Sequence, residues 1–265
     1  MTTTDLPLAS AREGGLAHWA AITWLLAQRT FRLRYLGSRL GIGWAFVQPV
    51  VQALVLSFMF TKVFKIVRVE HYPLYVLTGV MTWGAFAGGV GSATTSAVDN
   101  AALLRKIPLP VLVFPLSQVI AVLLVFAMQM VVLVGAAVLA GTLSLKALLM
   151  PLAIVLVGAT ATAVGTLACS FHVAVRDVKF FVESGLLMAF YATPILYDPA
   201  KLPADLRGWL ALNPMYGVVS LVRTSLMGHP LDAGALGISV GATAVLLVVA
   251  LAVFRHRSAD FADLV

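Results

Sequence analysis

Long apolar runs separated by short polar segments dominate the pattern of this chain. A transmembrane helix needs about 20 consecutive, mostly apolar residues. Six stretches meet that length, at about 43–63, 73–97, 109–140, 146–170, 178–197 and 233–254. The stretch 178–197 begins less apolar than the others, because Lys179 and Glu183 fall in its first turns. The pattern therefore predicts an all-α, polytopic membrane protein with six transmembrane helices.

A segment before the first span has the pattern of an amphipathic helix. Residues 16–40 place six apolar side chains on one face at helical spacing: Ile22, Leu25, Leu26, Leu33, Leu36 and Leu40. The end of this segment overlaps residues 34–49, RYLGSRLGIGWAFVQP, in which basic residues give way without a break to an apolar run. We expect a helix at the membrane surface that bends into the bilayer at Gly41 and Gly43. An ordinary cytoplasmic helix packed on the spans is the alternative.

The junction between this helix and the first span, residues 34–49, holds residue types that anchor helices at membrane interfaces. Arginine side chains can stay with lipid phosphates, and tryptophan prefers the interface. The expected anchors are Arg34, Tyr35, Arg39 and Trp44.

Residues 198–232 are too long for a turn between spans and predict two short helices. The first covers 203–212 and the second 214–227, with a break at Asn213 and Pro214. Each is too short to cross a bilayer. We therefore expect two gate helices on the outer side, with four candidate gate residues: Pro203, Asn213, Pro214 and Arg223.

Composition agrees with a membrane protein. Hydrophobic residues make up 61% of the 265 residues and charged residues 11%, whereas a soluble domain has about 25% charged residues. The net charge of +7 comes from basic residues beside apolar runs, which favours anionic lipid or an acidic protein surface over nucleic acid. The single cysteine, Cys169, excludes an internal disulfide.

Charge distribution predicts the orientation. The N-terminal residues do not have the pattern of a secretory signal, and more Lys and Arg fall on the N-terminal side of the spans than on the other. We expect both termini in the cytoplasm, with a cytoplasmic segment 1–42, a permease domain 43–255 and a cytoplasmic tail 256–265. Lys62, Lys65 and Arg68 are basic residues on the outer side and have no assigned role.

Several kinds of chemistry are excluded by missing motifs. No lysine follows a glycine, so the chain has no P-loop with which to hydrolyse ATP. No two of the five histidines stand at metal-ligand spacing, and there is no G-x-S-x-G nucleophile motif. The span cores carry essentially no charges, which weighs against a proton-coupled transporter. We expect neither enzyme activity nor a metal in this chain.

Two predicted cytoplasmic loops carry polar residues suited to a partner. In VDNAALLRKIPLP, Asp99 or Asn100 could cap a short helix with Leu103 and Leu104 on one side and Arg105 and Lys106 at its end. This helix is either a docking element or a plain connector. In the other loop, Arg176 and Asp177 form either a partner contact or a weak salt bridge.

Five motifs carry a resemblance to a known family. RYLGSRLGIGWAFVQP, NAALLRKIPLP, VRDVKFFVE, TPILYDPAKLP and LNPMYGVVSLVRTSLMG stand in the order found in polysaccharide-type ABC exporter permeases. Such permeases export O-antigen, capsule or teichoic-acid polymers. The resemblance runs from about residue 28 to 255.

The resemblance implies a homodimer in the bacterial inner membrane that pairs with two copies of a separate ATPase. ATP and magnesium would bind in that partner, and this chain would hold no cofactor. The helix at 99–106 resembles the coupling helix, which includes Asp99, Asn100, Leu103, Leu104, Arg105 and Lys106. A polysaccharide linked to a polyprenyl lipid would pass between the two protomers.

Aromatic side chains suit a channel for sugars, because their faces stack on sugar rings without fixing one register. Candidates near the outer side are Phe58, Phe60, Phe64, Tyr72, Tyr75, Tyr191 and Tyr197. Their alternative role is an interfacial belt that faces lipid.

The expected function is thus ATP-driven export of a lipid-linked polysaccharide, energised by the partner ATPase. Two alternatives stay open: an exporter of drugs or small lipids of the same broad class, and a membrane scaffold that transports nothing.

Overall fold

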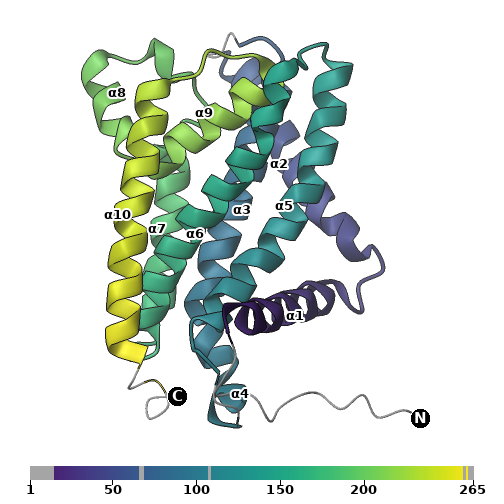
Figure 1. Cartoon of the computed structure of the whole chain (residues 1–265). Coiled ribbons are helices and arrows are strands. Elements are labelled where there is room, and N and C mark those ends of the chain that lie inside the picture. Colours follow the sequence, from purple (N-terminus) through teal and green to yellow (C-terminus); the bar gives the residue numbers. More distant parts are fainter. Residues whose placement is uncertain (1–14, 66–68, 107–108, 259–260, 262–265) are drawn as a thin grey trace.

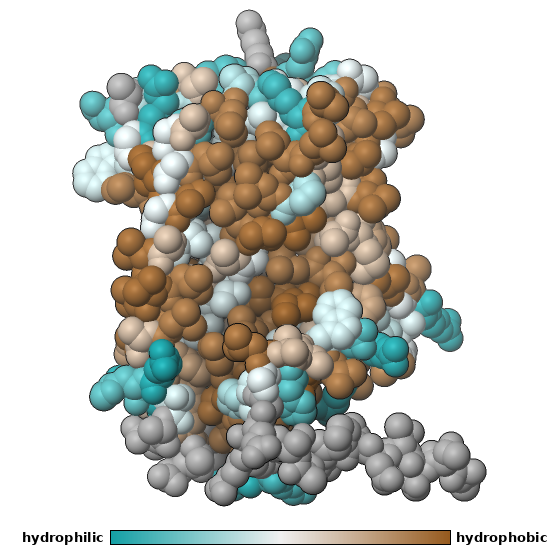
Figure 2. Space-filling view, viewed as in Figure 1, coloured by the Kyte–Doolittle hydropathy of each residue, from teal (hydrophilic) through white to brown (hydrophobic). Residues whose placement is uncertain are grey.

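The computed structural model describes residues 15–65, 69–106, 109–258 and 261, and all regular elements in them are helices (Figure 1). Five helices are long and apolar enough to cross a membrane: Gly41–Val63, Tyr72–Asp99, Val113–Leu139, Leu145–His172 and Ala233–Arg257. The predicted all-α membrane fold is therefore confirmed. In Figure 2, apolar side chains cover the middle of the visible face and polar side chains gather at its two ends.

Helix α3 (Tyr72–Asp99) forms the centre of the bundle and packs against α5 (Val113–Leu139) and α6 (Met150–His172). Small residues allow the close approach of α3 and α6. A Cβ atom at Gly165 would lie 2.7 Å from the Cβ of Ala93 and 3.3 Å from the Cα of Val90. Packing of small residues is a main source of helix association in membranes, where no water drives apolar surfaces together.

Helix α7 (Val178–Ala192) has 15 residues, fewer than a full span needs. The predicted span 178–197 is thus helical only in its first part. Thr193 has extended backbone angles, φ −89° and ψ 140°, because the following Pro194 disfavours the helical region for the residue before it. In Figure 1, α7 begins near the end of the bundle where α4 (Ala101–Lys106) lies and leads towards α8 and α9 at the opposite end.

Helix α1 (Leu16–Tyr35) lies across the bundle near the α4 end (Figure 1). It buries Thr23 and Ala27, and Gln118 of α5 donates a hydrogen bond to Thr30 Oγ1 at 3.3 Å. Its apolar residues divide into two groups: Ile22 and Leu26 are half-buried, whereas Leu25 and Leu33 are exposed. The helix therefore packs on α5 on one side and leaves apolar surface free on the other.

The predicted end of this helix at residue 40 is wrong. Helix α1 ends at Tyr35, so Leu36 and Leu40 lie outside it. Gly37 has φ +83° and Gly41 φ +51°, a left-handed conformation that glycine adopts without the steric cost of a Cβ atom. The chain therefore turns over residues 36–41. It continues through a 3₁₀ turn (Gly41–Gly43) into α2 (Trp44–Phe58) and a π-helical turn (Met59–Val63).

The two short helices expected after 198 are present. Helix α8 (Ala204–Ala211) agrees closely with 203–212, and α9 (Pro214–Met227) has the bounds expected. The Asn213 side chain caps α9 by accepting a hydrogen bond from Met215 N at 2.9 Å. Gly228, with φ +67°, follows the helix. The remaining elements are two 3₁₀ turns (Leu145–Leu149 and Pro199–Lys201) and α10 (Ala233–Arg257).

Candidate functional site

Polar side chains gather at the two ends of the bundle. The α4 end holds α4, the loop 173–177 and the last turn of α10, and the α9 end holds α8, α9 and the loop 228–232 (Figure 1).

At the α4 end, α4 follows α3 after Asn100. The backbone carbonyl of Asn100 accepts hydrogen bonds from Leu103 N at 2.9 Å and Leu104 N at 3.0 Å. The predicted side-chain cap differs from what is found, because both candidate side chains pair with α3. Asp99 accepts from Thr95 Oγ1 at 2.6 Å, and the Asn100 amide donates to the Ser96 carbonyl at 2.8 Å.

The surface of α4 combines charge with apolar groups. Arg105 and Lys106 are exposed, and Leu103 and Leu104 are half-buried. In the next loop at this end, Arg176 and Asp177 are exposed. The ion pair found beside them joins Lys179 to Glu183 at 3.9 Å across one turn of α7, an exposed pair of small energetic value.

The junction between α1 and α2 is tied to the bundle by polar contacts. Arg34 donates to Ser92 Oγ of α3 at 3.1 Å, and Gln129 of α5 donates to the Ala45 carbonyl at 2.7 Å. A pocket of about 240 Å³ lies here, lined in part by Arg34, Tyr35 and Trp44. Arg39 is exposed outside it.

At the α9 end, the predicted gate residues have different settings. Pro203 precedes α8 and is exposed, and Pro214 opens α9. Asn213 links two elements, because its amide also donates to Thr193 Oγ1, after the end of α7, at 2.7 Å. Arg223 is 4% exposed and lies in the core.

Arg223 joins three segments of the chain. Its Nη1 donates to the Pro194 carbonyl at 2.6 Å and lies 2.8 Å from Tyr75 Oη, while Nη2 donates to the Ile195 carbonyl at 2.8 Å. The guanidinium also stacks on the Tyr75 ring, 3.4 Å from its centroid. Arg223 of α9 thus holds α3 and the segment after α7 together.

Room for this arrangement comes from a glycine of α3. A Cβ atom at Gly79 would lie 2.9 Å from Cγ2 of Ile195 and 3.1 Å from Arg223 Nη2. Burial lowers the pKa of Arg223 to about 10, partly offset by Tyr75 and Asp198. The side chain therefore stays charged at pH 7, inside the protein, with carbonyl oxygens as its main partners.

The aromatic candidates divide into buried and exposed groups. Tyr72 and Tyr75 are 3% and 2% exposed, and their hydroxyls donate to the carbonyls of Leu196 at 2.7 Å and Tyr197 at 2.8 Å. Because they lie in the core, their predicted place on a channel surface is wrong. Phe58, Phe64 and Tyr191 are exposed, and Phe60 and Tyr197 are half-buried.

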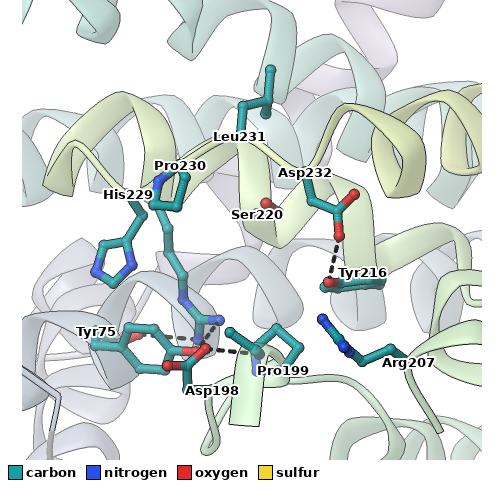
Figure 3. A pocket seen from close by; sticks show the side chains of 12 residues that line it. Tyr75, Asp198, Pro199, Arg207, Tyr216, Ser220, His229, Pro230, Leu231 and Asp232 are labelled. Carbon is teal, nitrogen blue, oxygen red and sulfur yellow. Dashed lines mark hydrogen bonds between the residues drawn. The ribbon is translucent and has the colours of Figure 1, made fainter. Parts of the chain in front are cut away.

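A second polar cluster at the α9 end was missed by the sequence reasoning. Tyr216 Oη donates to Asp232 Oδ2 at 2.8 Å, and Asp232 Oδ1 caps α10 by accepting from Ala235 N at 2.9 Å. With Asp198, Arg207, His229 and others they line a pocket of about 210 Å³ (Figure 3). The signal in the sequence is the charged and aromatic content of the segment after 198, which predicts polar contacts there but not which residues make them.

No group of three or more His, Cys, Asp or Glu residues suited to a metal ion occurs in the described part of the chain.

Comparison with known proteins places this architecture in a family. Residues 22–227 match the family described as ABC-2 type transporter. An O-antigen export system permease protein RfbA of Myxococcus xanthus is 29% identical over 242 residues, covering 90% of this chain and 93% of that protein. Two proteins of the same name from Klebsiella pneumoniae are 26% and 25% identical, each covering 91% of this chain and 93% of the relative. With a match over most of its length, this chain belongs to the ABC-2 type transporter family.

Proposed function

We propose that this chain is the permease subunit of an ABC transporter that exports a lipid-linked polysaccharide across the bacterial inner membrane. The observation that carries the proposal is the near full-length similarity to permeases named for O-antigen export. A separate ATPase, present in two copies, would bind ATP and magnesium and supply the energy.

The basic residues at the α4 end of the bundle support an orientation in which this end lies in the cytoplasm. Helix α1 lies across the bundle near this end, and α10 ends there with Arg255, His256 and Arg257 (Figure 1). Basic residues favour the cytoplasmic side. In this orientation α7 and residues 193–198 together form a sixth crossing, and the α9 end faces outwards.

Exposed apolar surfaces on α2 and α7 support a homodimer. On α2, Val51, Leu54 and Phe58 are more than half exposed, and on α7 Phe181 and Met188 are 79% and 70% exposed. Lipid covers part of such a surface, and a second protomer would cover the rest. A channel between protomers would then carry Phe58, Phe64 and Tyr191 as stacking surfaces for sugar rings.

The contacts also support a route from the ATPase to the gate. Closure of the ATPase would push α4, which is separated from the 28-residue helix α3 by the non-helical residue Asn100. The far end of α3 carries Tyr75, which Arg223 ties to α9. Because α3 joins the two ends of the bundle, a displacement at α4 would reach the gate through α3.

Deletion of the gene tests the proposal in the cell. Surface polysaccharide should disappear while lipid-linked polymer accumulates on the cytoplasmic side, and the intact gene should restore export. Normal surface polysaccharide together with increased drug sensitivity would contradict the proposal and favour a small-molecule exporter. Glycosyltransferase genes beside this gene would favour the polymer, whereas purification without any ATPase would favour a scaffold.

A further inference from the structure

The pocket at the α9 end combines hydrogen-bond donors with acceptors in one small space. Arg207 offers only donors, and Asp198 and Asp232 offer only acceptors. Arg223 also lines the pocket, but its Nη atoms donate to Tyr75, Pro194 and Ile195. The Ser220 hydroxyl can do both, and the Tyr216 hydroxyl, which donates to Asp232, can still accept. Figure 3 shows these side chains around one opening, with Asp198 and His229 near Tyr75 and Arg207 near Tyr216. Such a mixture matches a ligand with several hydroxyl groups, because each hydroxyl can donate to a carboxylate and accept from a guanidinium.

One donor in the lining has no protein partner. Arg223 is 4% exposed, and its Nη atoms are engaged by Tyr75, Pro194 and Ile195, but its Nε lacks a hydrogen-bond partner among the described residues. A buried donor left unpaired destabilises the folded protein. Because Nε is itself enclosed, a ligand oxygen or a bound water would recover part of that cost only after a small shift of the surrounding side chains.

The charge of the pocket is balanced. Two arginines face two aspartates. Burial, and to a lesser extent the positive charge of Arg223, lowers the pKa of His229, so its imidazole is neutral at pH 7 and adds both a donor and an acceptor. A phosphate would gain from the arginines but would be repelled by the carboxylates. An uncharged ligand avoids this repulsion.

The size of the pocket limits the ligand further. Its volume of about 210 Å³ is below the roughly 300–1,000 Å³ of sites for drug-sized ligands. It therefore suits a single ring. Tyr216, which is 4% exposed, fixes one wall through its bond to Asp232 at 2.8 Å, so the lining is largely preformed.

We propose that this pocket binds one uncharged sugar unit at the α9 end of each protomer. That the sugar belongs to the exported polymer rests on the proposed function. The site would hold a unit of the polymer as it leaves, at a place separate from the surfaces of α2 and α7 assigned above to the dimer.

Saturation-transfer NMR on the full chain in lipid nanodiscs tests the site without ATP or transport. The probes are the methyl glycosides of glucose, galactose and mannose, with inorganic phosphate as the competing anion. We expect at least one glycoside to bind and phosphate not to displace it. Ser220→Leu, which fills the pocket, and Arg207→Gln, which removes donors, should each weaken binding by about tenfold or more.

Lys146→Gln is the matched control, because Lys146 is exposed at the same end but outside the pocket, and it should leave binding unchanged. Ser220→Leu and Arg207→Gln should keep the thermal unfolding midpoint of the unaltered protein. Absence of a signal from all three glycosides, binding that both variants retain, or phosphate binding in place of sugar would overturn the proposal.

The result also separates this site from the proposed function. Sugar binding with normal surface polysaccharide in the deletion strain would contradict polymer export and keep the site. Loss of surface polysaccharide in the deletion strain without sugar binding here would contradict the site alone.

Discussion

At the scale of single residues, Arg223 is the side chain on which the α9 end depends most. It is a buried cation whose contacts are carbonyl oxygens and an aromatic ring rather than a carboxylate. Burial of a charge is costly unless its hydrogen bonds are satisfied. The four polar contacts to Tyr75, Pro194 and Ile195 offset that cost and fix α9 against α3 and residues 194–195.

Replacement of Arg223 should therefore destabilise the protein. Arg223→Met leaves the carbonyls of Pro194 and Ile195 without their donor, and we expect a loss of about 3 kcal/mol in the free energy of unfolding. Thermal unfolding of the purified protein in nanodiscs measures the change. Arg207→Met, an exposed arginine of α8, is the control and should have little effect; an equal midpoint for both variants would contradict the assigned role.

The sequence could not predict this setting of Arg223. Its place after the Asn213–Pro214 break identified the segment correctly, but Tyr75 and Gly79 lie about 150 residues earlier in the chain. Contacts between distant parts of the chain also explain why the burial of Tyr72 and Tyr75 could not be predicted. Helix α3 is apolar or small on most sides, so its sequence does not reveal that the tyrosines point into the bundle.

At the scale of elements, packing between helices depends on small residues at close crossings. One such crossing, with backbone atoms in contact, joins α9 and α10. A Cβ atom at Gly217 would lie 2.5 Å from Ser239 Oγ, 2.6 Å from the Ala235 carbonyl oxygen and 2.7 Å from Leu236 Cα. Two of these three atoms belong to the backbone, so a side chain here cannot be accommodated without separating the helices.

We expect Gly217→Ala to cost about 1–3 kcal/mol of stability through this steric conflict. Gly237→Ala, in α10, is the matched control, because a Cβ atom there meets nothing within 4 Å and alanine favours the helix by about 1 kcal/mol. The two unfolding midpoints should shift in opposite directions. A stabilised Gly217→Ala variant would show that α9 and α10 do not cross this closely.

The short helix α4 carries the prediction on coupling. If α4 docks on the ATPase, replacing Leu103, Arg105 or Lys106 by alanine should reduce export severalfold while the ATPase still hydrolyses ATP. Assays of export, ATP hydrolysis and complex assembly in each variant separate these effects. Lys146→Ala, at the opposite end of the bundle, is the control. Unchanged export in all three α4 variants would contradict the docking role.

The first and last residues of helices were predicted well where proline or capping residues mark them. They were predicted poorly where the backbone conformation of a glycine determines where the helix ends. Asn213 and Pro214 set the start of α9 at the expected residue. The end of α1 was placed five residues too late, because the sequence RYLGSRLGIG holds three glycines and does not tell which of them turns the chain. Likewise, the apolar run continues past Pro194, so hydropathy alone does not reveal that α7 ends before this proline.

At the scale of the whole molecule, hydrophobic patterning alone predicted the membrane class and the helical fold. Long apolar stretches have few alternative structures, since backbone polar groups in lipid must be satisfied within the segment. The pocket at the α9 end could not be predicted, because its residues come from α3, α8, α9 and two loops that only the folded chain brings together.

Reconstitution tests the central claim most directly. The permease and its ATPase, in proteoliposomes loaded on one side with lipid-linked polysaccharide from the deletion strain, should move the polymer across the bilayer only with ATP and only when both proteins are present. The appearance of polymer at the opposite surface, detected by its accessibility to an added glycosidase, is the measurement. ATP hydrolysis by the assembled complex without any movement of polymer would contradict the account.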